Sequence, residues 1–180
     1  MSGGFATIGY SNRPSQTVID MLLEAGIGVV VDVRSFPKSK NNPEFNVDVF
    51  PERLAEHQIA YRHVLALGGR RSKQPGVDDD LNAFWRVQSF HNYADYTQGS
   101  DFRVAFEELV VLGRERSLAM MCSEAVWWRC HRRIITDWLL LRGHEVRHLM
   151  ALGRIDKNAG ALIATINRNL TASKSWDGSK

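Results

Sequence analysis

The most reactive side chains of this sequence gather in one stretch, residues 117–133, which reads SLAMMCSEAVWWRCHRR. It contains both cysteines of the chain, Cys122 and Cys130, together with Glu124, His131 and three arginines. Thiolate, imidazole and carboxylate groups bind zinc, and a thiolate also acts as a nucleophile or a redox group. The stretch therefore predicts a reactive site, and several chemistries fit it.

The two cysteines allow three interpretations. Zinc binding would use Cys122, Cys130 and His131, although a gap of seven residues between the cysteines is not a zinc-finger spacing and adjacent Cys–His ligands are uncommon. A nucleophilic or redox thiol is favoured by nearby arginines and by a following helix N-terminus, because both lower a thiol pKa. Cys122 can also be a small buried hydrophobe at a strand end, which is a frequent role of free cysteine.

Three basic residues, Arg129, Arg132 and Arg133, lie in or near the first turn of the helix expected next. That end of a helix carries partial positive charge, so basic residues there are disfavoured without a counter-charge. Glu124 and Asp32 can supply part of it. A bound phosphate or carboxylate would supply the rest, since arginine is the preferred bidentate partner of both. We therefore expect an anionic ligand, with at least one of these arginines pointing to solvent.

Asp32, Arg34 and Ser35 stand at the end of another apolar run, residues 28–33. A carboxylate at such a strand end can orient a donor, hold a cation or act as a base. The simpler interpretation is an internal ion pair in which Asp32 and Arg34 close the end of the strand. Both interpretations place these residues beside the cysteine stretch, provided that the two strands are neighbours.

Short strands and helices alternate along the chain. Continuous β-branched residues at 28–33 are typical of a strand covered on both faces, and a strand at residues 5–8 and a helix precede it as a βαβ unit. In that helix Ser15 is the expected N-cap and Gly26 the expected exit. Further strands are predicted at residues 59–64, 118–121 and 144–149, and further helices at residues 50–58, 81–87, 91–96, 101–115 and from residue 130 onward.

This alternation predicts one three-layer α/β domain over residues 1–150, Rossmann-like or flavodoxin-like, with a mostly parallel sheet of about five strands and helices on both faces. Ligands of such folds bind beyond the carboxyl ends of the strands. Tyr10 and Ser11 after the first strand, and a turn at residues 68–70 in a long irregular region, are expected to complete the site. Residues 151–180 are predicted to be a partly disordered C-terminal extension.

The composition favours some classes of protein and excludes others. The chain has 180 residues, 44% of them hydrophobic, which is enough for a full core. It has no apolar run long enough for a membrane span and no secretory signal, and two cysteines suit a reducing compartment, so we expect a cytoplasmic protein without membrane contact. The net charge of +3 comes from residues 150–180, where Lys and Arg number 5 against 2 Asp and Glu, while the rest is balanced. A nucleic-acid partner is therefore indicated only weakly.

Several short motifs, taken together and in order, resemble the bacterial and archaeal family catalogued as domain of unknown function 488. They are TIGYS (residues 7–11), VDVRS (31–35), PEFN (43–46), YR (61–62), LGG (67–69), YA (93–94), MCSE (121–124) and CHR (130–132). The resemblance implies one α/β domain with its shared polar residues at strand ends, and it implies no reaction. Tyr10 stands where the family usually has histidine, which removes one possible metal ligand or base, and Trp127 stands where proline is frequent.

We expect an enzyme, or an enzyme-derived binder, that acts on a small anionic ligand such as a nucleotide or a nucleic-acid end. In this hypothesis Arg34 and Arg132 hold the anion, Glu124 or Asp32 is the acid or base, and Cys122 is the nucleophile. The other ligand-binding residues expected are Tyr10, Ser11, Ser35, Cys130 and His131. One alternative is a non-catalytic module that binds zinc or senses redox state through its Cys–His groups. The other is a nucleic-acid accessory protein that binds through the basic extension. The sequence requires no cofactor, and zinc is the one that it permits.

Overall fold

The computed structural model describes residues 3–157, which fold around a six-stranded sheet with the strand order β3-β2-β4-β1-β5-β6. The strands are β1 (Gly4–Gly9), β2 (Val29–Asp32), β3 (Ala60–His63), β4 (Ser117–Cys122), β5 (Val146–Ala151) and β6 (Arg154–Lys157). The first five run parallel to their neighbours, and β6 pairs antiparallel with β5 at one edge. The predicted mostly parallel sheet is confirmed, with six strands in place of about five.

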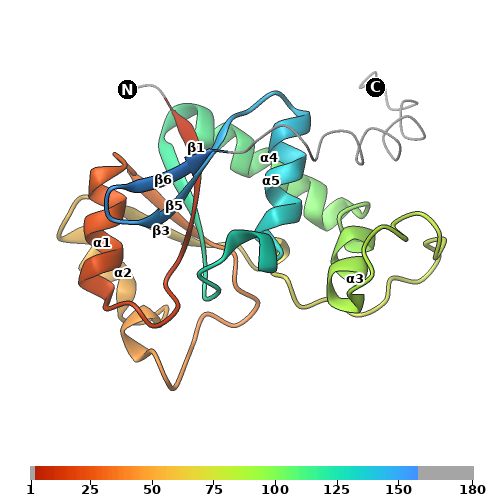
Figure 1. Ribbon diagram of the computed structural model, residues 1–180, viewed down its shortest axis with the longest axis horizontal. Coiled ribbons are helices and arrows are strands. Elements are labelled where there is room, and N and C mark those ends of the chain that lie inside the picture. Colours follow the sequence, from red (N-terminus) through yellow and green to blue (C-terminus); the bar gives the residue numbers. More distant parts are fainter. Residues whose placement is uncertain (1–2, 158–180) are drawn as a thin grey trace.

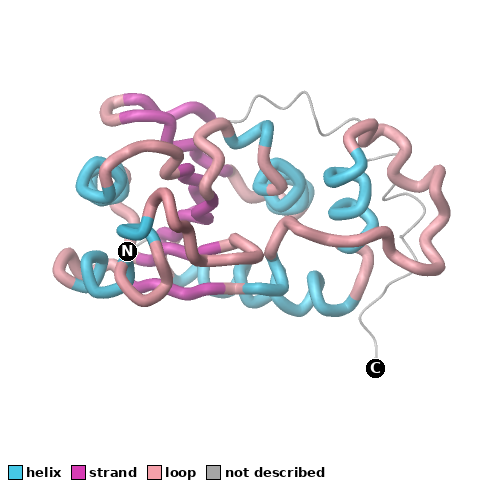
Figure 2. Tube along the Cα trace, turned by 90° about the horizontal axis from the view of Figure 1, so that it is seen from below, coloured by secondary structure: helices cyan, strands magenta, loops and turns pink. Residues whose placement is uncertain are grey.

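Helices cover both faces of this sheet, so the domain has three layers (Figure 1, Figure 2). The helices are α1 (Ser15–Glu24), α2 (Phe50–Ala55), α3 (Gln88–Tyr96), α4 (Ser100–Glu115) and α5 (Arg132–Leu141), with short 3₁₀ turns η1 (Pro43–Phe45), η2 (Leu65–Leu67) and η3 (Trp127–Arg129). Residues of α1 and α2 belong to one apolar core, and residues of α3, α4 and α5 belong to the other. The predicted α/β fold with helices on both faces is therefore confirmed.

The central strand β4 contributes to both cores. Its Leu118 and Met120 belong to the core with α4 and α5, whereas Ala119 and Met121 belong to the core with α1 and α2. Burying a Leu or Met side chain stabilises a fold by about 1.5–3 kcal/mol, so a strand that is covered twice carries apolar residues at every position. This is why the apolar run in the sequence identified the strand.

The winding of the chain changes direction at β4. The connections from β1 to β2 and from β2 to β3 run through α1 and α2 on one face, whereas those that lead into and out of β4 run through α4 and α5 on the other. Because β4 lies between β1 and β2 in the sheet, segments that leave these neighbouring strands diverge to opposite faces. Such a switch point leaves a crevice beyond the carboxyl ends of the strands.

Two local predictions are wrong, and both fail because a polar side chain turns inward. Pro14, not Ser15, is the N-cap of α1, and the buried Ser15 hydroxyl donates to Glu44. Residues 81–87 form turns in place of a helix, because Asn82 is buried and donates to Asp95 at 2.8 Å.

The sheet extends past residue 150, where the sequence predicted the domain to end. In β6, Ile155 and Asp156 lie opposite residues of β5, so residues 154–157 belong to the folded domain. Residues 158–180 of the predicted extension, including most of its basic excess, lie outside the described residues. None of the described helices combines the length and the apolar character that crossing a membrane requires.

Asp137 is a buried carboxylic acid on α5. It is 2% exposed, and neither of its carboxylate oxygens has a hydrogen-bond partner among the described residues. Burial raises the pKa of Asp137 to about 7, against the opposing effect of Arg133. Over the range from the ordinary pKa of an aspartate up to about 7, the unfolded chain is ionised at this position while the folded chain is not. Stability is therefore lost as the pH rises through that range.

Replacing Asp137 with asparagine removes this titration. We expect Asp137→Asn to change the free energy of unfolding little at pH 4 and to raise it by about 4 kcal/mol at pH 8, because no buried group is then forced to ionise. Urea unfolding at the two pH values measures the effect, and Glu108→Gln, an exposed acid on α4, is the control. An Asp137→Asn effect of equal size at both pH values would contradict the raised pKa.

Candidate functional site

A cavity of about 630 Å³ lies at the carboxyl edge of the sheet, where the loops after β1, β2, β3 and β4 converge. Asp32 and Arg132 are not among its lining residues, because they are 0% and 1% exposed and lie behind its wall. The other predicted site residues do line it: Tyr10, Ser11, Arg34, Ser35, Cys122, Glu124, Cys130 and His131, with Gly69 and Arg70 from the predicted turn. The structure therefore brings the polar residues that follow β2 and those of the cysteine stretch to one cavity.

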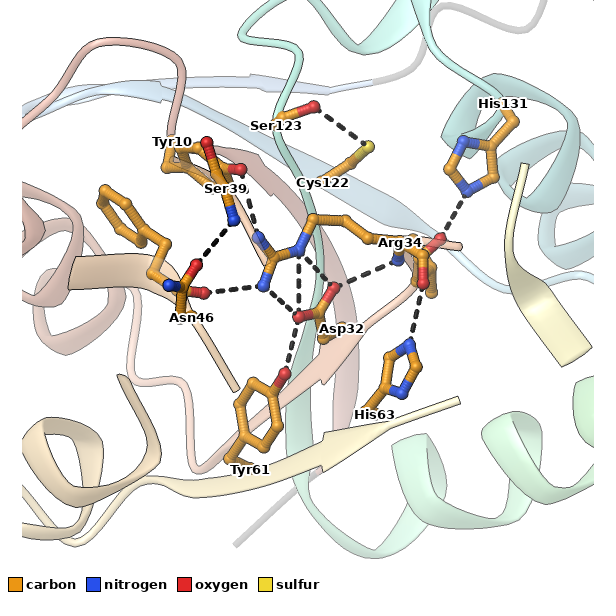
Figure 3. A network of polar contacts seen from close by, with 12 residues as sticks. Tyr10, Asp32, Arg34, Ser39, Asn46, Tyr61, His63, Cys122, Ser123 and His131 are labelled. Atoms are coloured by element: carbon orange, nitrogen blue, oxygen red, sulfur yellow. Dashed lines mark hydrogen bonds and ion pairs between the residues drawn. The ribbon is translucent and has the colours of Figure 1, made fainter. Parts of the chain in front are cut away.

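Asp32 and Arg34 form a buried ion pair at the end of β2 (Figure 3). Arg34 Nε lies 2.9 and 3.0 Å from the two carboxylate oxygens of Asp32, and Nη2 lies 2.5 Å from Oδ2. The guanidinium also donates to the Tyr10 hydroxyl at 3.1 Å and to the Phe45 carbonyl at 2.7 Å. Burial alone would lower the pKa of Arg34, but Asp32 raises it above its ordinary value. Most of the donors of Arg34 are thus used within the protein.

Cys122, Cys130 and His131 form the floor of the cavity, and this set is called the floor below. The two Sγ atoms and a ring nitrogen of His131 all lie within 4.8 Å of one another, and Cys130 Sγ is 3.4 Å from His131 Nδ1. His131 Nε2 is 2.8 Å from the Val33 carbonyl oxygen (Figure 3). Because a carbonyl only accepts, Nε2 carries the proton and Nδ1 presents its lone pair to the sulfur atoms.

The two free thiols differ in acidity. A hydrogen bond from the Cys122 thiol, together with the positive charge of Arg132, lowers the pKa of Cys130 to about 6, although burial opposes this shift. The same hydrogen bond, in which Cys122 keeps its proton, and burial raise the pKa of Cys122 to about 12. These shifts make Cys130 the more acidic of the two thiols. The nucleophile role expected for Cys122 stays a prediction.

Arg132 is buried behind the floor. Its Nε donates to Cys130 Sγ at 3.4 Å, and its Nη2 donates to the Glu124 carbonyl oxygen. It forms no ion pair with a carboxylate of residues 3–157. Within the described residues the guanidinium therefore faces the Cys130 sulfur in place of a carboxylate. At 1% exposure it has almost no surface with which to hold an anion.

Three exposed residues, Phe36, Arg70 and Arg129, line the mouth of the cavity and are called the rim. Neither arginine forms an ion pair with a carboxylate of the described chain. Phe36 is 65% exposed, and the Arg70 guanidinium lies 5.3 Å from the centre of its ring. Sequence reasoning did not single out Phe36, although an aromatic residue in a polar loop directly after a strand was a usable signal.

Two glycines allow close approaches that shape the site. A Cβ at Gly9 would lie 1.9 Å from the Glu124 carbonyl oxygen, so the loop after β4 can pass over the end of β1 only above a glycine. A Cβ at Gly69 would lie 2.4 Å from His131 Nδ1, so the ring fits only against a glycine. The other face of the ring packs edge-on against Tyr93, with ring centres 5.1 Å apart.

The tryptophan pair between the two cysteines divides into a packed and an exposed ring. Trp127 stacks parallel on His148 with ring centres 3.9 Å apart, whereas Trp128 is 44% exposed. Neither ring lines the cavity. Trp127 is therefore a packing residue that anchors η3, and through η3 it sets the position of Arg129 and Cys130.

The fold and the cavity together define a doubly wound α/β protein with a polar cavity at its topological switch point. A family model described as "Domain of unknown function DUF488" matches residues 14–139, and the chain belongs to this family. No curated protein and no solved structure matches the chain. The family resemblance found in the sequence is confirmed. Since the family description names no activity, the function has to be argued from the cavity.

The role of Arg132 as an internal counter-charge leads to a prediction about stability. We expect Arg132→Met, which keeps most of the volume and removes the charge, to lower the free energy of unfolding at pH 7 by about 2–4 kcal/mol, because the buried Cys130 sulfur and the Glu124 carbonyl lose their donor. Chemical denaturation measures the loss. Arg103→Met, an exposed arginine on α4, is the control and is expected to change stability by less than about 0.5 kcal/mol. Full stability of Arg132→Met would show that the guanidinium is not needed there.

Proposed function

We propose that this protein is an enzyme that binds a small anionic ligand, of nucleotide or phosphate type, in the cavity at the carboxyl ends of β1, β2 and β4. The observation that carries the proposal is the charge of the rim. Arg70 and Arg129 come from different loops, are exposed, and have no carboxylate partner in the described chain. Glu124 is the one acidic side chain among the described residues that line the cavity. Exposed arginines in a concave site are suited to bidentate binding of phosphate or carboxylate.

Neutral hydrogen-bonding groups complete the surface that an anion would meet. Hydroxyl and amide side chains from the loops after β1, β2 and β4 line the cavity: Ser11, Asn12, Ser35, Ser39, Asn42 and Ser123. Ser35 Oγ accepts a hydrogen bond from the Arg70 amide at 2.9 Å, which fixes the backbone that carries this rim arginine. Lys38 also lines the cavity, but it pairs with Asp48 at 3.0 Å. The positive charge available to a ligand is therefore that of the rim.

The apolar part of the rim favours a nucleotide over a bare phosphate. Phe36 presents an exposed ring beside Arg70, and Phe90 lines the same cavity. A base can stack on an aromatic ring or on a guanidinium plane, which is typically worth about 1–3 kcal/mol per base. An anion held by Arg70 and Arg129 and a base on Phe36 would together occupy the mouth of the cavity.

The reactive groups lie below that ligand. The floor carries the sulfur atoms and the imidazole, and Glu124 is the exposed carboxylate positioned to exchange a proton with a ligand in the cavity. Asp32 is the weaker acid–base candidate, because its oxygens bind Arg34 and accept from Tyr61 at 2.6 Å. In the reducing cytoplasm that we propose for this protein, both cysteines stay reduced.

Nucleotide binding by variants of the rim tests the proposal. Isothermal titration of the full chain with nucleoside monophosphates, in the presence of a metal chelator, is expected to detect binding that Arg129→Ala weakens about tenfold, or about 1.4 kcal/mol. The double variant Arg70→Ala/Arg129→Ala is expected to lose more affinity, and Arg103→Ala is expected to keep the wild-type affinity. Phe36→Ala is expected to weaken the binding of nucleotides while leaving the binding of inorganic phosphate unchanged. Equal affinity of the wild type and the double variant would refute the proposed anion site.

A further inference from the structure

The side chains of the floor form a set that is characteristic of a metal site. We propose that Cys122, Cys130 and His131 bind one zinc ion, and that the fourth coordination position of this ion opens into the cavity. The metal site does not require the anionic ligand to be present, whereas the use of the ion in catalysis rests on the proposed function.

The spacing of the three ligand atoms is the first argument. Zinc bonds of about 2.3 Å to sulfur and about 2.0 Å to nitrogen, at tetrahedral angles, separate the ligand atoms by about 3.5–3.8 Å. Cys130 Sγ and His131 Nδ1 are 3.4 Å apart, and all three ligand atoms lie within 4.8 Å of one another. Movements of less than about 1 Å, within the reach of small side-chain rotations, would bring them to the required distances.

The orientation of His131 is the second argument. Its Nε2–H donates to the Val33 carbonyl, which leaves the Nδ1 lone pair directed at the cysteines. A backbone carbonyl that fixes the tautomer of a histidine is the usual outer partner of a zinc ligand. Close contacts with Gly69 and with the Tyr93 ring limit the other positions that the imidazole can take.

The backbone explains how adjacent residues can bind one ion. Consecutive side chains of an extended segment point in opposite directions, which is why neighbouring Cys–His ligands are uncommon. Here Cys130 is extended, with φ −126° and ψ 153°, whereas His131 has the helical values φ −56° and ψ −18°. The change of conformation between the two residues brings their side chains to the same side.

The chemistry of the set selects the ion and the kind of site. Two thiolates and an imidazole are soft ligands, which favour zinc over magnesium or calcium. Arg132 donates to Cys130 Sγ and so stabilises a thiolate there. Structural zinc sites are closed by four protein ligands, whereas catalytic sites have three and keep one position open. All three ligands line the cavity, so an open position would face the bound ligand. In catalysis, a water at that position would then replace a cysteine sulfur as the reactive group.

Metal titration of the wild-type chain is the first test. The full chain, made without a histidine tag, reduced and stripped with a chelator, is expected to take up one zinc ion per chain in competition with a chromophoric chelator. Cobalt in place of zinc is expected to give thiolate-to-metal charge-transfer absorption and the intense visible bands of a four-coordinate site. Zinc-edge X-ray absorption is expected to show two sulfur ligands and two nitrogen or oxygen ligands. Absence of stoichiometric binding, or a site without sulfur, overturns the proposal.

Substitution of single ligands is the second test. Cys122→Ser, Cys130→Ser and His131→Ala are each expected to weaken zinc binding at least about 100-fold, more than the loss of an outer partner costs. Ser89→Ala, at an exposed residue of α3 that lines the same cavity, is the matched control and is expected to keep the wild-type affinity. Circular dichroism in chelator checks that each variant folds. If a cysteine variant does not fold, the zinc affinity of His131→Ala and the absorption spectrum of the cobalt-loaded wild type still show whether the metal binds at this site. Unchanged affinity in His131→Ala also overturns the proposal.

The two proposals fail separately. Nucleotide titration in chelator measures the affinity of the rim for nucleotide without any metal. Zinc titration without nucleotide measures the affinity of the floor for zinc alone. Zinc binding without nucleotide binding leaves the metal site standing and removes the proposed substrate class. Nucleotide binding without zinc binding leaves the floor as a metal-free thiol pair.

Discussion

The buried ion pair between Asp32 and Arg34 is the interaction on which the carboxyl edge of the sheet depends. The two side chains are 0% and 5% exposed, so either charge without the other would be strongly destabilising. Arg34 also donates hydrogen bonds to the Tyr10 hydroxyl after β1 and to the Phe45 carbonyl of η1, while Asp32 accepts one from Tyr61 of β3. One guanidinium–carboxylate pair thus links the ends of β1 and β2 to β3 and to the η1 loop. The cavity wall keeps its shape because these segments cannot move independently.

The strands and the order of layers could be predicted because the forces that select them are local or periodic. Continuous apolar runs identified β2 and β4, since a strand buried on both faces has no solvent position. Gly26, expected at a helix exit, adopts φ +67°, which favours glycine strongly. The failures have the opposite character. Ser15 and Asn82 turn away from their local backbone toward Glu44 and Asp95, partners that are remote in the sequence. No local pattern contains such a partner.

The location of the site was predictable from the sequence, but the division of roles within it was not. Strand-end polar residues had to meet at one edge, and Cys122, Cys130, His131 and Arg34 do. The cavity is open to whichever arginine the helix does not turn inward, and the charges in the sequence do not show which arginine is buried. Arg132 lies at the buried face of α5 and donates to the Cys130 sulfur, while Arg129, one 3₁₀ turn earlier, stays in solvent. The expectation that these arginines hold an anion is therefore carried further only for Arg129.

The proposed ion and the proposed anion are linked by the charge of the floor. Without a metal, the Cys130 thiolate and Arg132 nearly cancel, and a second thiolate at Cys122 would repel an anion. A divalent cation on two thiolates beside Arg132 gives the floor a net positive charge, directly below the rim arginines. Zinc would therefore strengthen anion binding, and by thermodynamic linkage the anion would strengthen zinc binding by the same factor. In a metal-free dithiol floor the effect on anion binding has the opposite sign, because each further ionisation of a sulfur atom weakens the binding of the anion. The sign of this coupling separates a metalloenzyme from a thiol sensor built on the same residues.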